Sequence, residues 1–379
     1  MKIPAAIFDK LAQRQNAGAV RSLPLSNDLV DFSSNDYLGF ARSQHIFDAT
    51  NQWLAQRGIK TNGATGSRLI SGNHFLYAQA ESMLGSFHQS ESALIFNSGY
   101  DANVGFFSAV PQKADVILYD ALCHASIRDG IRLSAARSFK FAHNDPEDLE
   151  RLILRSPTGG NIYVATESVF SMDGDAPPLA ELFELCEKYG CFPVVDEAHA
   201  LGVFGDRGAG LVAQLGLQDK VFARVVTFGK ALGCHGAAIL GPAPLRDYLV
   251  NFARSFIYTT GLSPHAVANI IAAYDALQTD HAALAGLRDN IIHFVQSVNL
   301  LHLRPVFVYS KSAIQCAIVP GNQRARSLAS HLQAKGFDVR AILSPTVPQG
   351  QERLRICLHS YNTKSQIDAL LVELAAALF

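Results

Sequence analysis

Six polar side chains follow apolar segments that have the length of buried strands, and their types suit chemistry on a carbonyl group. They are His124, Ser171, Asp196, His199, Thr227 and Lys230. Lys230 lies in a run of small residues, Gly229–Cys234, just beyond an apolar segment that ends at Val226. Partial desolvation by such a setting lowers the pKa of an amine, which favours carbonyl addition and a Schiff base. The alternative is an ordinary surface lysine, and this stretch alone does not separate the two.

The elements that must position these side chains alternate between strand and helix. Apolar segments expected as strands begin at Ser92 and cover residues 115–119, 161–166, 191–195 and 225–226, with a helix expected at 74–88. This alternation predicts an α/β fold with a mostly parallel sheet and helices on both faces. Ligands of such sheets bind beyond the carboxyl ends of the strands, where the six side chains fall.

A possible phosphate site follows the segment that begins at Ser92. Ser98, Gly99 and Tyr100 lie where a helix should begin, and Asp101 falls in its first turn. Backbone N–H groups at a helix N-terminus attract anions, so this turn could hold a phosphate.

Two earlier segments carry further candidates for ligand contact. Asp31–Gly39 contains Asn35 and Tyr37, and the glycine-rich stretch Gly63–Gly72 surrounds Arg68. Ordinary turns would explain both segments equally well.

The pattern changes near residue 265, which predicts a second, smaller domain. Expected there are a helix at 264–300, strands at 313–319, 337–341 and 352–358, and helices at 323–335 and 363–378. Arg353 and Arg355 fall on one face of the last strand, because side chains alternate along a strand. The predicted organisation is an N-terminal arm (1–35), a large domain (36–264) and a small α+β domain (265–379).

Composition narrows the function classes. The 379 residues are 49% hydrophobic and 17% charged, with a net charge of −1 and no basic stripe. We therefore expect no nucleic-acid partner and no membrane partner. The six cysteines include no CxxC pair, which favours reduced thiols in the cytoplasm and argues against a metal site. Met1–Asp9 lacks the layout of a signal peptide.

Several stretches together resemble a known family along nearly the whole chain. They are Ser34–Gly39, Gly66–Gly72, Glu167–Asp175, Asp196–His199 and Thr227–Lys230. The chain resembles the α-oxoamine synthases, which are fold-type I pyridoxal-phosphate (PLP) enzymes of the aspartate aminotransferase superfamily. The glycine-rich loop and the short N-terminus are most similar to the branch that condenses L-alanine with pimeloyl-CoA, or a pimeloyl carrier protein, in biotin biosynthesis. Glu197 and Cys234-His235 depart from that branch.

The resemblance implies roles for the catalytic residues. Lys230 would carry PLP as a Schiff base and later move the Cα proton. Asp196 would keep the pyridine nitrogen protonated, because an electron-accepting ring needs that proton. His199 would donate to the phenolic oxygen of the ring, and His124 would stack on the ring face.

The resemblance also implies the binding residues and a homodimer with shared sites. The phosphate would lie on the N–H groups near Ser98, Gly99 and Tyr100 and on the Thr227 hydroxyl. Thr259 and Thr260 would reach it from the partner subunit, and Ser171 would contact the cofactor oxygen or the substrate. The remaining roles are the substrate carboxylate for Arg355, with Arg353 as the alternative, and the acyl entrance for Asn35 and Arg68.

Three other functions stay open. A sister condensation would use glycine or serine with another acyl thioester, as in enzymes that make 2-amino-3-ketobutyrate, 3-ketosphinganine or 5-aminolevulinate. An aminotransferase would share the lysine and the aspartate but would release no thiol. A non-catalytic scaffold would need an additional partner module.

Overall fold

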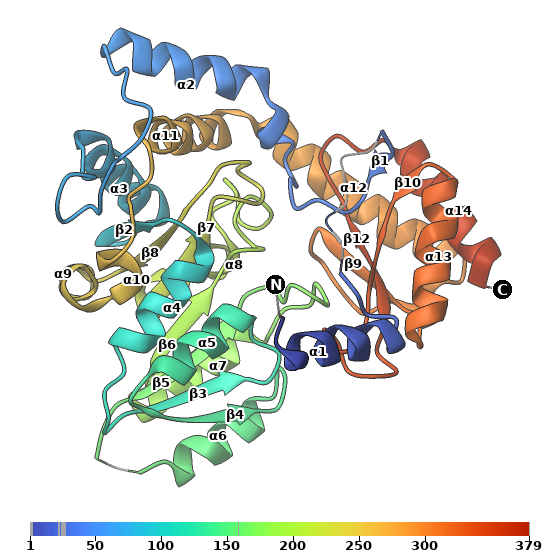
Figure 1. The fold of residues 1–379 in the computed structure, drawn as a ribbon, viewed down its shortest axis with the longest axis horizontal. Helices are drawn as coiled ribbons and strands as arrows, with labels where there is room; N and C mark the ends of the chain where they lie inside the picture. Colours follow the sequence, from blue (N-terminus) through green and yellow to red (C-terminus); the bar gives the residue numbers. More distant parts are fainter. Residues whose placement is uncertain (1–2, 22, 24–27, 158, 379) are drawn as a thin grey trace. The chain divides into compact units, whose positions relative to one another are not determined.

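The computed structural model describes residues 3–21, 23, 28–157 and 159–378. Its contacts divide the chain into two units. The large unit comprises Asn35–Ser171 and Asp175–Ala285, and the small unit comprises Met1–Ser34, Met172–Gly174 and Gly286–Phe379. Figure 1 labels the elements of both.

A seven-stranded sheet forms the centre of the large unit. Its order is β2 (Ser92–Phe96), β8 (Ala237–Gly241), β7 (Ala223–Thr227), β6 (Phe192–Asp196), β5 (Ile162–Glu167), β3 (Val116–Asp120) and β4 (Arg137–Phe141). The four pairs from β7 to β4 are parallel, and β8 is antiparallel to both of its neighbours. The mostly parallel sheet predicted from the sequence is confirmed.

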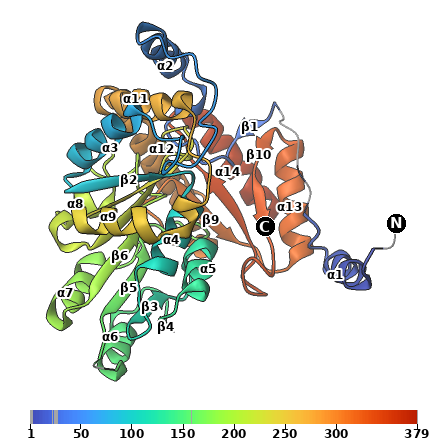
Figure 2. The same cartoon turned by 60° about the vertical axis from the view of Figure 1, so that its left-hand side comes forward.

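Helices cover both faces of this sheet. Figure 2 shows α4 and α5 on one face and α6 and α7 on the other. The helices of the large unit are α2 (Gln44–Gln56), α3 (Phe75–His88), α4 (Gly99–Ala109), α5 (Ala125–Leu133), α6 (Pro146–Arg155), α7 (Leu179–Tyr189), α8 (Leu211–Gln214), α9 (Ala243–Phe252), α10 (Arg254–Ile257) and α11 (Pro264–Thr279). Short 3-10 turns lie at Phe40–Arg42 and Gln218–Lys220.

An apolar core between the sheet and helices α4, α5, α9 and α10 fixes the ends of the strands. Phe96 of β2 packs on Phe256 of α10 with ring centroids 5.4 Å apart, and Phe106 of α4 is fully buried. Burying an aromatic or branched side chain of this kind contributes about 1.5–3 kcal/mol. The helix N-termini that follow β2 and β3 are thereby held in place.

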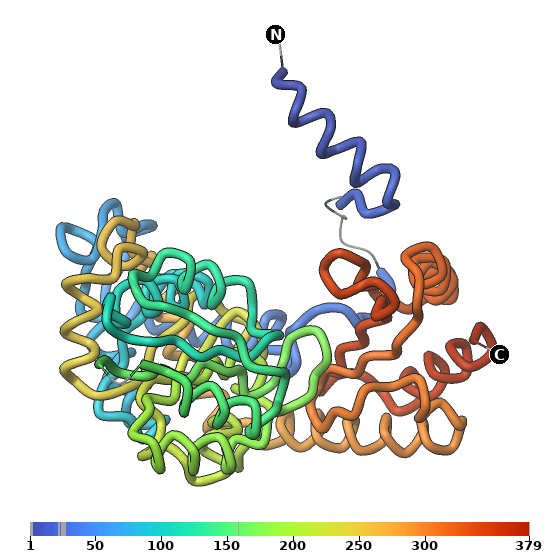
Figure 3. The backbone as a smooth tube through the Cα atoms, turned by 90° about the horizontal axis from the view of Figure 1, so that it is seen from below, coloured from blue at the N-terminus to red at the C-terminus, as the bar shows by residue number. Residues whose placement is uncertain are grey.

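The small unit contains a three-stranded antiparallel sheet in the order β11 (Arg340–Ile342), β12 (Arg353–Cys357) and β9 (Ile314–Ile318). A two-stranded parallel sheet joins β1 (Val30–Asp31) to β10 (Phe337–Asp338). Its helices are α1 (Ala5–Asn16), α12 (His281–Leu300), α13 (Asn322–Ala334) and α14 (Lys364–Leu378), with a 3-10 turn at Arg304–Val306. Helix α1, dark blue in Figure 3, has no buried residue.

The expected N-terminal helical arm of about 30 residues is shorter in the structure. Helix α1 ends at Asn16, and β1 begins at Val30. Residues 1–2, 22 and 24–27 of that arm lie outside the described residues.

Three expectations about the elements need correction. The helix predicted at 264–300 is two helices, because Asp280 ends α11 and its Oδ1 accepts the N–H groups of Ala282 and Ala283, each at 3.1 Å, at the start of α12. The strand predicted at 337–341 is two strands in different sheets, β10 and β11, and strands β4 and β8 were not predicted. The expected domain boundary at 264/265 also differs from the division of contacts, which falls at 285/286 and groups the N-terminal arm with the C-terminal residues.

Two further features are absent from the described residues. None of their helices has the length and apolar character needed to cross a membrane. No cluster of histidine, cysteine or acidic side chains among them could hold a metal ion.

Candidate active site

Lys230 lies in a cavity of about 160 Å³ at the carboxyl ends of the strands. Its Nζ is 2.7 Å from Nε2 of His199, which follows β6. The cavity is lined by Gly99, Tyr100, Asn103, His124, Ser126, Glu167, Asp196, Ala198, His199, Thr227 and Lys230. Of the six side chains predicted at the strand ends, five line this cavity: His124, Asp196, His199, Thr227 and Lys230. Ser171 does not line it.

Asp196 ends β6 and is held by two donors. Its Oδ2 accepts from Nδ2 of Asn103 at 2.7 Å, and its Oδ1 accepts the N–H of Ala198 at 2.8 Å. Asn103 lies on α4, so the core contacts of that helix orient the carboxylate. Both oxygens are fixed, and only 7% of the residue is exposed.

His124 connects to the same network through Ser126. It caps the N-terminus of α5, where its Nδ1 accepts the N–H of Ser126 at 3.2 Å and lies 2.7 Å from the Ser126 hydroxyl. That hydroxyl accepts from Nδ2 of Asn103 at 3.0 Å. Burial lowers the pKa of His124, and the charges of Lys230 and Arg128 act in the same direction. The imidazole is therefore held neutral, as a ring suited to stacking.

The Asn35–Tyr37 segment reaches this site through hydrogen bonds. The Tyr37 hydroxyl donates to Oδ1 of Asn35 at 3.1 Å and lies 2.7 Å from Nδ1 of His199. Because Nε2 of His199 faces Lys230, a single chain of contacts runs from Asn35 to the lysine amine. Tyr37 is fully buried, so it fixes the orientation of His199.

The start of α4 lines one end of the cavity through Gly99 and Tyr100. Ser98 caps the helix, and its hydroxyl oxygen accepts the N–H of Asp101 at 3.0 Å. A Cβ added at Gly99 would lie 2.5 Å from Oγ1 of Thr227, so only glycine leaves this space open. A helix N-terminus with a hydroxyl beside it suits a phosphate.

Sequence reasoning missed three polar side chains of the cavity: Asn103, Ser126 and Glu167. Glu167 ends β5 opposite Asp196, is 3% exposed, and accepts the N–H of His124 at 2.6 Å. Burial and the nearby charge of Asp196 raise the pKa of Glu167 to about 8. Its place at a strand end beside Asp196 was the available signal, because neighbouring parallel strands end at the same edge of a sheet.

Thr259, Thr260 and Arg68 have other contacts in this chain. Asn97 donates through Nδ2 to Oγ1 of Thr259 at 3.0 Å and to the carbonyl of Thr260 at 2.6 Å. Arg68 pairs with Glu81 at 2.6 Å and stacks on the Tyr77 ring, 3.7 Å from its centroid. Among the described residues, the lining of the Lys230 cavity includes none of the three.

Arg353 and Arg355 lie on β12 of the small unit, and both are buried. Arg353 forms an ion pair with Asp173 and donates to the Met172 carbonyl. Arg355 contacts Sγ of Cys357 through Nη1 at 2.9 Å. Arg353 is thus engaged by the segment Met172–Asp173.

Glu197, one of the departures from the family pattern, is fully buried and does not line the cavity. Its Oε2 accepts from Nη2 of Arg224 at 2.5 Å, and its Oε1 accepts the N–H of Val212 at 2.9 Å. It therefore holds β7 and the start of α8 together.

Comparison with known proteins identifies the family. The family model for class I and II aminotransferases matches residues 27–374. The chain belongs to the class I and II aminotransferase family. Within this family, 8-amino-7-oxononanoate synthase of Emericella nidulans is 43% identical over 97% of this chain and 92% of its own length.

Two solved structures carry the same fold. Serine palmitoyltransferase from S. paucimobilis, with a bound PLP–myriocin ligand, matches with a TM-score of 0.90 at 27% identity over 99% of this chain and 98% of its own. 8-Amino-7-oxononanoate synthase from Francisella tularensis matches with a TM-score of 0.79 at 28% identity over 93% and 98%. The expected fold-type I architecture of PLP-dependent enzymes is confirmed.

The cavity fits PLP on the structure's own evidence. The space opposite Thr227 exists only because residue 99 is a glycine. Oδ1 of Asn103 is buried and has no hydrogen-bond partner among the described residues, so it can accept from a bound group. The Lys230 amine, the Asp196 carboxylate, the His124 imidazole and the start of α4 line one cavity. In this order, they suit the aldehyde, the ring nitrogen, the ring face and the phosphate of PLP.

Proposed function

We propose that this protein catalyses the decarboxylative condensation of L-alanine with pimeloyl-CoA, or a pimeloyl carrier protein, in biotin biosynthesis. The products are 8-amino-7-oxononanoate, CO₂ and the free thiol. One observation carries the proposal: Lys230, His199, Asp196 and His124 line one cavity in a chain related to synthases of that name. The six cysteines are free thiols, which supports a reducing compartment such as the cytoplasm.

PLP, when bound, withdraws electrons from the amino-acid Cα and so makes its proton removable. The chain must hold the ring. Asp196, fixed by Asn103 and the N–H of Ala198, lies ready for the pyridine N–H. His124 would lie against the ring face, and Ser98, Gly99, Tyr100 and Thr227 would bind the phosphate.

Lys230 would hold the cofactor in the resting enzyme and afterwards remove and return the Cα proton. Nε2 of His199 lies 2.7 Å from the Lys230 amine, and Tyr37 orients the His199 ring. His199 would therefore hold the amine in place while the amine carries the Cα proton. For the alanine carboxylate we propose Arg355, with Arg353 on the same strand face as the alternative. Ser171 is proposed to contact the cofactor oxygen or the substrate, and Asn35 and Arg68 to line the acyl entrance.

We further propose a homodimer with shared sites, in which Thr259 and Thr260 contact the partner's phosphate. Exposed apolar side chains on two joined segments support this. Leu69 and Ile70 are 50% and 87% exposed, and Tyr258 is 73% exposed. Their segments meet where the N–H of Gly261 donates to the Gly66 carbonyl at 3.0 Å. Exposed apolar groups gathered in this way mark a surface for another protein, here a second copy.

A second candidate is condensation of serine with palmitoyl-CoA, favoured by the TM-score of 0.90 to serine palmitoyltransferase. A screen of alanine, glycine and serine against pimeloyl- and palmitoyl-CoA, following CO₂ and free thiol together, decides between the two. The proposal expects the highest kcat/KM for alanine with pimeloyl-CoA. A preference for serine with palmitoyl-CoA would replace it, and amino transfer without thiol release would indicate an aminotransferase.

A further inference from the structure

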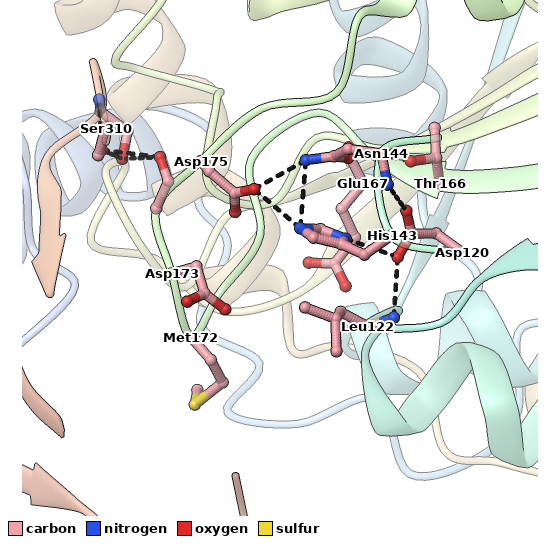
Figure 4. Close-up of polar contacts among 12 residues, drawn as sticks. Asp120, Leu122, His143, Asn144, Thr166, Glu167, Met172, Asp173, Asp175 and Ser310 are labelled. Atoms are coloured by element: carbon pink, nitrogen blue, oxygen red, sulfur yellow. Dashed lines mark hydrogen bonds and ion pairs between the residues drawn. The ribbon is translucent and has the colours of Figure 1, made fainter. Parts of the chain in front are cut away.

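His143 lies just beyond β4, bound on both sides by carboxylates (Figure 4). Its Nδ1 is 2.9 Å from Oδ1 of Asp120, and its Nε2 is 2.8 Å from Oδ2 of Asp175. An ionised carboxylate only accepts hydrogen bonds, so both ring nitrogens must carry protons. The two carboxylates raise the pKa of His143 to about 10, against the opposing effect of burial. The ring is a cation that joins two anions.

Asp120 extends this contact to the turn that leads to His124. It is fully buried at the end of β3. Its Oδ1 accepts the N–H of Leu122 at 2.8 Å, and its Oδ2 accepts the N–H of Asn144 at 2.8 Å. The carboxylate thus shapes the turn that delivers His124 to the start of α5.

Asp175 extends the contact to the loop after β5. Its backbone carbonyl accepts the N–H of Phe170 at 3.0 Å, and Nδ2 of Asn144 donates to its Oδ2 at 2.7 Å. The Phe170 ring packs edge-on against His143, with centroids 4.5 Å apart and an interplanar angle of 85°. Ser171 follows Phe170 directly. The loop begins with the N–H of Ser168 donating to the Asp196 carbonyl at 2.9 Å.

We propose that His143 is a positioning residue for the reaction, whose doubly paired ring holds the turn of His124 and the loop of Ser171 in one arrangement. It joins the exits of three strands, β3, β4 and β5, and two of these exits carry side chains assigned to the cofactor. A neutral imidazole has one N–H and can donate to only one of the two carboxylates, and alanine at this position donates to neither. The inference rests on the proposed function, since the roles of His124 and Ser171 belong to it.

The test compares His143→Ala and His143→Gln with a matched control, His293→Ala. His293 lies on α12 in the small unit, with Nε2 2.8 Å from Oδ1 of Asp368, and its side chain is 22% exposed against 26% for His143. His143→Ala removes two histidine–carboxylate contacts and His293→Ala removes one, at histidine side chains of similar exposure. The PLP dissociation constant, kcat and KM are measured well below each variant's melting temperature.

The expected result is specific to His143. His143→Ala weakens PLP binding and lowers kcat/KM by about tenfold or more, since small displacements of positioned groups cost that much. His143→Gln falls between His143→Ala and the wild type, and His293→Ala stays within about twofold of the wild type. If His143→Ala matches His293→Ala in both PLP affinity and kcat/KM, the cluster only stabilises the fold and the inference is overturned. If the wild type binds PLP but condenses no thioester, the proposed function fails. The PLP affinities of the variants then still test whether His143 positions the turn of His124 and the loop of Ser171.

Rescue by added imidazole provides a readout that a general loss of stability would not give. Imidazole can fill the space left in His143→Ala, and as a cation it can donate to both carboxylates. Normalised to the wild type at each pH, the inference expects half of the recovery of kcat/KM at a lower imidazole concentration at about pH 6 than at about pH 9, because free imidazole is mostly neutral at about pH 9 and must take up a proton to pair with both carboxylates. Half-recovery at an equal or lower imidazole concentration at the higher pH would contradict the need for a doubly donating ring.

Discussion

Replacing Glu167 by glutamine should make the protein more stable at alkaline pH and leave it nearly unchanged at acid pH. Burial and Asp196 raise the pKa of Glu167 from 4.5 to about 8 in the folded protein. Between these values the folded chain keeps a proton that the unfolded chain has lost. The stability that this proton represents is complete below about pH 4.5 and is lost as the pH rises through about 8. Glutamine keeps an oxygen for the His124 N–H and carries no charge at any pH.

The size of the effect follows from the two pKa values. Each pH unit between the two values corresponds to about 1.4 kcal/mol, so the free energy of unfolding of the wild type falls by at most about 5 kcal/mol. Relaxation and water entry soften the burial of a charge, so we expect Glu167→Gln to gain about 2 kcal/mol over the wild type above about pH 9. The assay is urea unfolding of cofactor-free protein at about pH 5 and pH 9, because bound PLP would add its own charges to the cavity.

A contrasting variant tests the same reasoning. Glu197→Gln leaves Arg224, 2% exposed, without its carboxylate, so it should lose about 3–5 kcal/mol at both pH values. A gain for Glu167→Gln that is equal at both pH values, or a loss at alkaline pH, would refute the protonated state of Glu167.

Three further predictions concern the cofactor and the second subunit. Gly99→Ala should weaken PLP binding by about tenfold or more, because the added Cβ would lie 2.5 Å from Oγ1 of Thr227. An unchanged PLP affinity in a fluorescence titration would show that the phosphate does not bind at this turn. Asp196→Asn should cost on the order of 10²-fold in kcat with the fold intact, because an amide does not hold the pyridine proton, and turnover near wild type would leave the aspartate purely structural. A mixed dimer of Lys230→Ala with Thr259→Val/Thr260→Val should recover about half the wild-type activity, because shared sites put both defects in one pocket. Activity from a monomer, or no recovery on mixing, would count against sites built from two chains.

The sequence predicted the parts of the fold that carry strong local signals. Apolar runs that end in polar side chains located β3, β5, β6 and β7, and their parallel order brought Asp196 and Lys230 to one edge. Strand β4 escaped prediction because Arg137–Phe141 carries charge and is mostly exposed at the sheet edge. Strand β8 escaped because Ala237 and Ala238 have little strand preference, and only burial between β2 and β7 makes them a strand.

The sequence predicted Lys230, Asp196, His199 and His124 of the candidate site, but it missed Glu167 and the neutral side chains that orient these residues. Asn103 lies inside a helix and Ser126 lies one residue inside the next, where nothing local marks either as part of a network. The Asn103–Ser126 contact arises only when α4 and α5 pack together, and the Asn103–Asp196 contact only when α4 packs beside the end of β6. The roles of Thr259, Thr260 and Arg355 stay predictions, because they concern a second chain or the small unit.

The most direct test of the central claim is to locate the cofactor on the chain. Purified holoenzyme is reduced with borohydride, which makes a lysine–PLP link permanent, then digested and sequenced by mass spectrometry. The account predicts that the pyridoxyl group lies on Lys230, and that Lys230→Ala protein treated in the same way carries none. A pyridoxyl group on another lysine of the wild type, with Lys230 unmodified, would contradict the account.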